Sequence, residues 1–94
     1  MSEQGLYEVR LAPRAEKDLK KLQKRVLKQV LADIRELAKN PRPPGAIKLE
    51  DEEGLYRLRC GDIRVIYCIE SKVLVVTVVR VGDRKNVYKK DLGK

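Results

Sequence analysis

Residues 55–69 read Leu-Tyr-Arg-Leu-Arg-Cys-Gly-Asp-Ile-Arg-Val-Ile-Tyr-Cys-Ile, and this stretch decides the fold. Gly61 and Asp62 lie between two runs in which apolar and polar side chains largely alternate. This pattern is typical of a β-hairpin closed by a two-residue turn. With these two residues as the loop, Arg59 is placed directly opposite Arg64.

The hairpin register sorts the side chains into two faces. Because side chains alternate along a strand, Arg57, Arg59 and Arg64 emerge together, and Leu58 and Val65 emerge on the other side. Like charges directly opposite each other destabilise a sheet, and a polyanion lying across the arginines would relieve that repulsion. We therefore predict that the arginine face is the functional centre.

Apolar residues are expected beside the arginines on that same face. An apolar patch next to cations suits a protein partner as well as a nucleic acid. The residues expected there are Ile66, Cys68, Leu74, Val76 and Val78.

Residues 14–40 contain no glycine or proline, and their apolar positions follow a helical spacing. One straight helix of that length would span ~39 Å. A compact domain of this size is only about 32 Å across. The sequence therefore predicts a break near Gln23 and Lys24, giving a helical hairpin that ends in the proline-rich segment 40–45.

The remaining segments predict strands around this hairpin. Residues 6–11 alternate as a first strand, residues 46–49 are a short extended entry, and residues 73–81 are apolar enough for a central strand covered on both faces. The predicted order is β-α-α-β-β-β. This is an α+β fold, one domain over residues 1–94, with a helical hairpin packed on one face of an antiparallel sheet.

The charge balance indicates an anionic partner. The 94 residues carry 22 basic and 14 acidic side chains, a net charge of +8. This favours a polyanion or an acidic protein, although a solvated lysine-rich surface would explain it too. The helical segment carries a basic stripe that is either a solvated face or a contact for a nucleic-acid backbone, formed by Lys17, Lys20, Lys21, Lys24 and Lys28.

Other classes of function find little support in the sequence. No run is long and apolar enough for a signal peptide or a membrane span, so we expect a cytoplasmic protein. Cys60 and Cys68 fall on opposite faces of the predicted hairpin, which forbids a disulfide between them. With no histidine and only these two cysteines, we expect neither a metal site nor a cofactor.

Three blocks of the sequence carry a family resemblance: Tyr-Arg-Leu-Arg at 56–59, Gly-Asp-Ile-Arg-Val-Ile-Tyr at 61–67, and Val-Gly-Asp-Arg at 81–84 with Val-Tyr at 87–88. Together they resemble the RelE toxins of the RelE/ParE superfamily of toxin–antitoxin systems. The resemblance covers nearly the whole chain and includes the β-α-α-β-β-β order. It implies a small toxin around which an antitoxin wraps.

The resemblance also implies an activity and a set of site residues. RelE-type toxins cleave messenger RNA in the ribosomal A site, whereas ParE-type toxins poison DNA gyrase. Arg84 and Tyr88 match RelE catalytic positions, and Arg64 matches the arginine thought to stabilise the transition state. The residues expected to bind RNA are Arg57, Arg59, Arg80 and Lys85.

One departure from the family bears on the chemistry. RelE toxins commonly carry lysines where this chain has Arg57 and Arg59. Arginine cannot be deprotonated in a protein, so neither residue can act as a general base, but both can hold phosphate oxygens bidentately. We therefore expect a shifted mechanism or a lower activity.

The expected reaction is metal-free cleavage, in which the RNA 2′-hydroxyl attacks the adjacent phosphorus. Without histidine, the remaining proton-transfer candidate is Tyr88; a tyrosine has a reference pKa of about 10, which crowded cations lower. Such an enzyme needs the ribosome to position its substrate. The expected partners are a RelB-like antitoxin, the ribosome and mRNA, and operator DNA only through the antitoxin. A gyrase poison and a catalytically weakened, antitoxin-binding member remain the alternatives.

Overall fold

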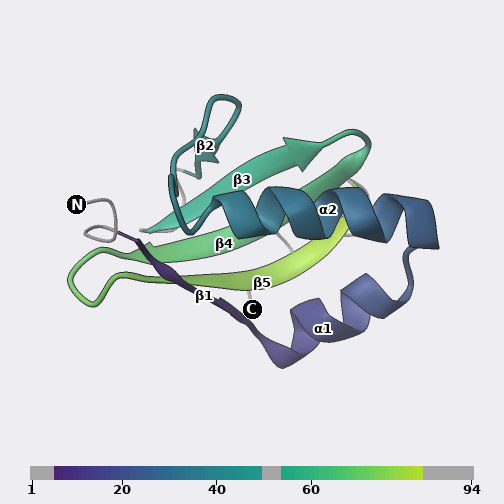
Figure 1. The fold of residues 1–94 in the computed structure, drawn as a ribbon, viewed down its shortest axis with the longest axis horizontal. Helices are drawn as coiled ribbons and strands as arrows, with labels where there is room; N and C mark the ends of the chain where they lie inside the picture. The colour runs from purple at the N-terminus through teal and green to yellow at the C-terminus, as the bar shows by residue number, and fades with distance from the viewer. Residues whose placement is uncertain (1–5, 50–53, 84–94) are drawn as a thin grey trace.

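The computed structural model describes residues 6–49 and 54–83, which form two helices and five strands. Figure 1 shows α2 lying across one face of the sheet. In chain order the elements are β1 (Glu8–Leu11), α1 (Pro13–Lys20), α2 (Lys24–Glu36), β2 (Ile47–Lys48), β3 (Leu55–Cys60), β4 (Ile63–Glu70) and β5 (Val75–Asp83).

The helical segment breaks where the sequence predicts it. Pro13 opens α1, where its missing N–H costs nothing, and the chain reverses at residues 21–23. From Lys24, α2 runs back across the sheet (Figure 1). The helical hairpin is thereby confirmed.

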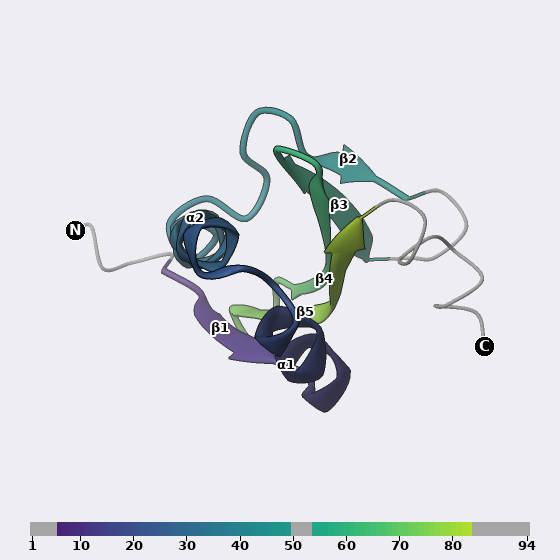
Figure 2. The same cartoon turned by 90° about the vertical axis from the view of Figure 1, so that its right-hand side faces the viewer.

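The five strands form one sheet in the order β1-β5-β4-β3-β2, and Figure 2 shows it from a second side. The β2–β3, β3–β4 and β4–β5 pairs are antiparallel, but β1 runs parallel to β5. The predicted all-antiparallel sheet is therefore wrong in this one pairing. Alternation identifies β1 as a strand but carries no information about its partner or direction.

The core lies between the helices and one face of the sheet. Both helices contribute buried side chains, and so does the residue after α2: Ala15, Leu19, Val30, Ile34 and Leu37. The strands meet them with Leu58, Cys60, Val65, Tyr67, Ile69, Val76, Val78 and Val81. The α+β class with both helices on one face of the sheet is thus confirmed. None of the helices in the described ranges is long and apolar enough to cross a membrane.

The composition of the open face, the sheet face opposite the helices, differs from the prediction at β5, which contains a β-bulge. Ile66 pairs with Arg80 and Tyr67 with Val78, which leaves Val79 as an extra residue in β5. Val76 and Val78, which precede the bulge, lie in the helix-side core and not beside the arginines. The prediction for these two valines is wrong because the turn at residues 71–74 pairs them with Ile69 and Tyr67, which are core residues of β4.

The start of β5 also differs from the prediction. The strand begins at Val75, and residues 71–74 form the turn after β4. Leu74 is exposed in this turn, with a positive φ of 56°. It is therefore not part of an apolar patch within the sheet.

Candidate nucleic-acid interface

The hairpin that carries the arginines has the predicted register. Cys60 pairs with Ile63, Arg59 with Arg64, and Arg57 with Ile66. Gly61 has a φ of 64°, a conformation that glycine adopts at the first position of a type II′ turn. The turn therefore fixes which residues oppose each other, and it brings the two arginine side chains to adjacent positions on the open face.

The three arginines differ in their surroundings. Arg59 is exposed and makes no hydrogen bond or ion pair within the described residues. Arg57 is half-buried, and its Nε is buried without a hydrogen-bond partner among those residues. Burying such a donor unpaired is costly, so an incoming phosphate oxygen would satisfy it.

Arg64 departs from the expectation of an uncovered side chain. Only 8% of its surface is exposed. Its neighbour on the same face, Ile66, is 2% exposed although it is not part of the helix-side core. Arg64 is therefore a buried cation, and its truncation removes packing as well as charge.

Arg80 pairs with Ile66 on β4, and its side chain is buried in an ion pair. Its Nε donates to the Asp18 carboxylate of α1 over 2.8 Å, and the two side chains are 8% and 7% exposed. This part of β5 lies beyond the end of the β1 pairing, and α1 packs beside it. The Arg80 Nε is thus engaged by Asp18, and the RNA-binding role of Arg80 stays a prediction.

Arg84, Lys85 and Tyr88 lie outside the described residues. Within the described ranges no group of histidine, cysteine, aspartate or glutamate side chains is arranged to hold a metal ion. The arrangement that is visible, three guanidinium groups on one sheet face, is suited to binding phosphate oxygens.

A stack of aromatic side chains on the other face was not predicted from the sequence. The rings of Tyr56 and Tyr67 lie 5.8 Å apart, and the Arg42 guanidinium lies 5.4 Å from the centre of the Tyr56 ring. The Tyr67 hydroxyl donates to the Pro41 carbonyl oxygen over 2.7 Å, and burial raises the pKa of Tyr67 to about 12. This stack holds the segment after α2 against the sheet. Alternation places both tyrosines on the core face, but nothing in the sequence indicates Arg42.

Both cysteines are free and lie on opposite faces, as the register predicts. Burial, with a hydrogen bond to Asp33 as a smaller cause, raises the pKa of Cys60 to about 12. Burial also raises the pKa of Cys68. Both thiols are therefore protonated near neutral pH and are poor nucleophiles.

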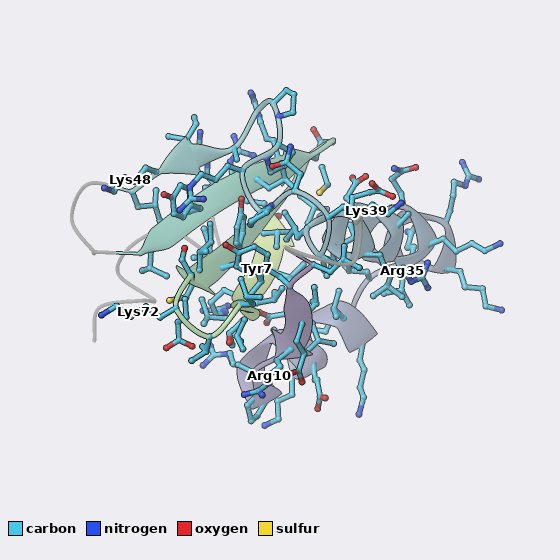
Figure 3. All side chains as sticks on the ribbon, turned by 60° about the vertical axis from the view of Figure 1, so that its left-hand side comes forward. Tyr7, Arg10, Arg35, Lys39, Lys48 and Lys72 are labelled. Atoms are coloured by element: carbon cyan, nitrogen blue, oxygen red, sulfur yellow. The ribbon has the colours of Figure 1, made fainter. Side chains whose placement is uncertain are left out.

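The helix layer carries most of the exposed positive charge that the structure describes. Figure 3 shows Arg35 and Lys39 extending outward from α2 and the turn after it. Asp18 is buried and paired with Arg80, so it does not offset these cations at the surface. The exposed acids of residues 13–39 are Glu16 and Glu36. The exposed cations are Arg14, Lys17, Lys20, Lys21, Lys24, Arg25, Lys28, Arg35 and Lys39.

Residues 9–88 match the protein family described as the ParE toxin of type II toxin–antitoxin system, parDE. The chain belongs to this family. It is 31% identical to a putative RelE-like toxin protein of Escherichia coli over 86 residues, which cover 87% of this chain and 90% of that protein. The chain is therefore a RelE-type toxin of the RelE/ParE superfamily.

Solved structures agree with this assignment. The archaeal RelE–RelB complex of Pyrococcus horikoshii contains a chain that is 31% identical, with a TM-score of 0.76, covering 87% of this toxin and 99% of that chain. In the RelBE2 complex of Mycobacterium tuberculosis the identity is 30% and the TM-score 0.74, with 84% and 99% covered. Both are toxin–antitoxin complexes, which supports an antitoxin as partner of this toxin.

Proposed function

We propose that this toxin is a ribosome-dependent, metal-independent endoribonuclease (an mRNA interferase) that cleaves mRNA in the A site and so inhibits translation. The observation that carries the proposal is the pairing of Arg59 with Arg64 across the hairpin, with Arg57 on the same face. A phosphodiester lying over this face would place negative charge beside three guanidinium groups, which favours its binding there. The RelE-like relatives support the same interpretation.

In the proposed reaction the 2′-hydroxyl oxygen of one nucleotide attacks the adjacent phosphorus. Its proton leaves to a base, the P–O5′ bond breaks, and an acid protonates the departing 5′-oxygen, giving a 2′,3′-cyclic phosphate and a 5′-hydroxyl. Arg57 and Arg59 hold the non-bridging oxygens, and Arg64 stabilises the extra negative charge of the phosphorane. From the resemblance, we assign Tyr88 to proton transfer and Arg84 to phosphate stabilisation, with Lys85 binding RNA nearby.

Dependence on the ribosome follows from the weakness of these acid–base groups. Histidine, the usual proton-transfer residue near neutral pH, is absent from the sequence, so most of the acceleration comes from electrostatics and from holding the substrate in line. A ribosome presents a codon in a fixed geometry. The exposed cations of the helix layer would contact the phosphate backbone of ribosomal RNA.

The proposal extends to partners and location. A RelB-like antitoxin would neutralise the toxin by covering the arginine face with acidic and apolar side chains, as the +8 charge favours. Operator DNA would be bound only through that antitoxin. The site of action would be the cytoplasm, where the ribosomes are.

A second candidate function is the poisoning of DNA gyrase on the same fold. The matched family is described as the ParE toxin, and the arginines at positions 57 and 59 replace the lysines common in RelE toxins. A gyrase poison needs no nuclease residues. It would use the arginine face for protein contact alone.

Primer extension separates the two candidates. A defined mRNA is incubated with the purified toxin in a translation extract, and in parallel without ribosomes. The proposal predicts cuts within the A-site codon of stalled ribosomes and little cleavage of free RNA. Intact mRNA together with toxin-dependent linearisation of supercoiled plasmid by gyrase would instead establish the second candidate.

A further inference from the structure

The parallel pairing of β1 with β5 ends before β5 does. The register runs from Glu8 opposite Val75 to Leu11 opposite Val78, and the Ala12 N–H then donates to the Val78 carbonyl oxygen over 2.9 Å. The chain then turns into α1 (Figure 1). Beyond Val78, the edge of β5 that faced β1 has no strand beside it in the described part of the sheet.

Beyond the end of β1, Asp18 of α1 binds the free edge of β5. One oxygen of its carboxylate, Oδ2, accepts a hydrogen bond from the Val81 backbone N–H over 2.9 Å. The same atom accepts from the Arg80 Nε over 2.8 Å. Asp18 thus satisfies a backbone donor that a neighbouring strand would otherwise pair, and Arg80 neutralises its charge.

This contact lies on β5 directly before the residue that pairs with Arg64. Gly82, the residue after Val81, pairs with Arg64 on β4, and the bulge at Val79 lies just before Arg80. The position of residues 80–82 therefore determines how the backbone of Arg64 is supported from the β5 side. A bulge locally disrupts the ladder, so this end of β5 depends on contacts outside the sheet.

We propose that Asp18 is a positioning residue: with Arg80 as its counter-ion, it holds the C-terminal end of β5 so that Arg64 stays aligned with Arg59 on the phosphate. The inference rests on the proposed nuclease function. It assigns to α1, a helix on the opposite side of the sheet, an effect on the rate of the chemical step. A displacement of about 1 Å at a catalytic group can lower a rate on the order of 10²-fold.

The test replaces the whole ion pair. In the double variant Asp18→Leu with Arg80→Met, apolar side chains of similar size replace both charges, a change that is often neutral for stability. Asp18→Asn is the second variant, because it keeps an oxygen for the Val81 N–H and loses only the charge. Glu16→Gln, an exposed change on the same helix, is the matched control.

Single-turnover cleavage on programmed ribosomes and amide hydrogen exchange are measured for each folded variant. The inference predicts that the double variant loses at least tenfold in the cleavage rate constant. The concentration of programmed ribosomes that gives half the maximal rate should change less than threefold. Its Val81 amide should exchange at least tenfold faster, and that of Leu58 on β3 should not. For Asp18→Asn, both the cleavage rate constant and the Val81 exchange rate should lie between those of the double variant and those of the unchanged control.

Two negative results are distinguishable. In the first, the wild type cleaves and the folded double variant cleaves at the wild-type rate; the ion pair is then structural only, and this inference alone is overturned. Where the double variant does not fold, the same conclusion follows from a wild-type rate in Asp18→Asn. In the second, the wild type does not cleave mRNA on ribosomes, and both the proposed function and the inference are contradicted.

Discussion

Arg59 and Arg64 face each other across one hairpin, yet they have different physical roles. Arg59 is exposed and unpaired within the described residues, whereas Arg64 is 8% exposed. An exposed guanidinium can be removed with little effect on stability, but removal of a buried one leaves a cavity and weaker packing behind. Substitutions at the two positions therefore report on different properties.

Substituting Arg64 separates packing from phosphate recognition. We expect Arg64→Ala to lower the free energy of unfolding by about 1–3 kcal/mol, a typical loss for a buried side chain, and to abolish toxicity. Arg64→Lys keeps the charge and most of the stem but not the planar fork, so it should retain most stability and still lose toxicity. Growth after induction and thermal melts measure both effects. Full toxicity of the folded lysine variant would argue against phosphate recognition by Arg64.

The buried Cys60 thiol makes stability fall at high pH. Its pKa rises from 9.0 to about 12, chiefly through burial, so the folded state retains a proton that the unfolded state releases. The stabilisation is fully present below pH 9 and is lost as the pH rises through the folded pKa. Tyr67 adds an effect of the same sign, because its pKa also rises to about 12. Between about pH 8 and about pH 10.5, the denaturant concentration at the midpoint of unfolding should fall less in Cys60→Ala than in wild type. An equal fall in both proteins would contradict this role of Cys60.

At the scale of elements, the sequence predicts what is local. The hairpin register follows from Gly61 and Asp62, and the helix break follows from the length of an uninterrupted helical pattern. The parallel partner of β1 and the extra residue in β5 do not follow. Strand pairing over long sequence separation and a single inserted residue leave no periodic signal.

The same limit explains how much of the candidate site could be predicted. Alternation alone places Arg57, Arg59 and Arg64 on one face, and the register confirms it. Arg80 pairs with Ile66 of that face, but its ion pair with Asp18 of α1 could not be predicted, because the two residues lie far apart in the sequence. The burial of Arg64 depends on packing against residues that are distant in the sequence, so a local pattern does not predict it.

The turn between β4 and β5 contains a strained residue. Leu74 has a φ of 56°, is 40% exposed, and its carbonyl oxygen accepts from the Glu8 N–H over 2.8 Å. A left-handed conformation costs a branched residue roughly 1–2 kcal/mol, whereas asparagine tolerates it. Leu74→Asn should therefore raise the free energy of unfolding by up to about 1 kcal/mol in urea titrations.

Val73→Asn is the control for this turn. Val73 is 63% exposed, and its φ is not positive. The same kind of change there should leave stability within about 0.5 kcal/mol of wild type. Equal stabilisation by both variants would assign the effect to reduced surface hydrophobicity instead of backbone strain.

At the scale of the whole molecule, positive charge is distributed over both sides of the sheet. The arginine face lies on one side, and the exposed cations of α1 and α2 lie on the other. Binding of RNA phosphates releases counterions, so each bound phosphate makes affinity more dependent on salt. The two surfaces can therefore be distinguished by their salt slopes.

Neutralising the turn between the helices should weaken binding to ribosomes. We expect the triple variant Lys20→Gln, Lys21→Gln and Lys24→Gln to reduce the slope of log affinity against log salt by about one for each phosphate that is no longer bound. The rate of cleavage of bound mRNA should change little. Lys48→Gln with Lys72→Gln, exposed cations elsewhere on the molecule, is the control (Figure 3). An unchanged slope in the triple variant would identify the helix layer as a solvated surface.

The most direct test of the arginine face is single-turnover cleavage of mRNA on programmed ribosomes by wild type, Arg59→Gln and Lys72→Gln. Arg59 is exposed, so its substitution should leave the fold intact and remove only the proposed phosphate ligand. We expect a loss on the order of 10²-fold for Arg59→Gln, comparable to removing one donor from an oxyanion site, and a rate within about twofold of wild type for Lys72→Gln. Equal cleavage rates for all three proteins would contradict phosphate binding by the arginine face.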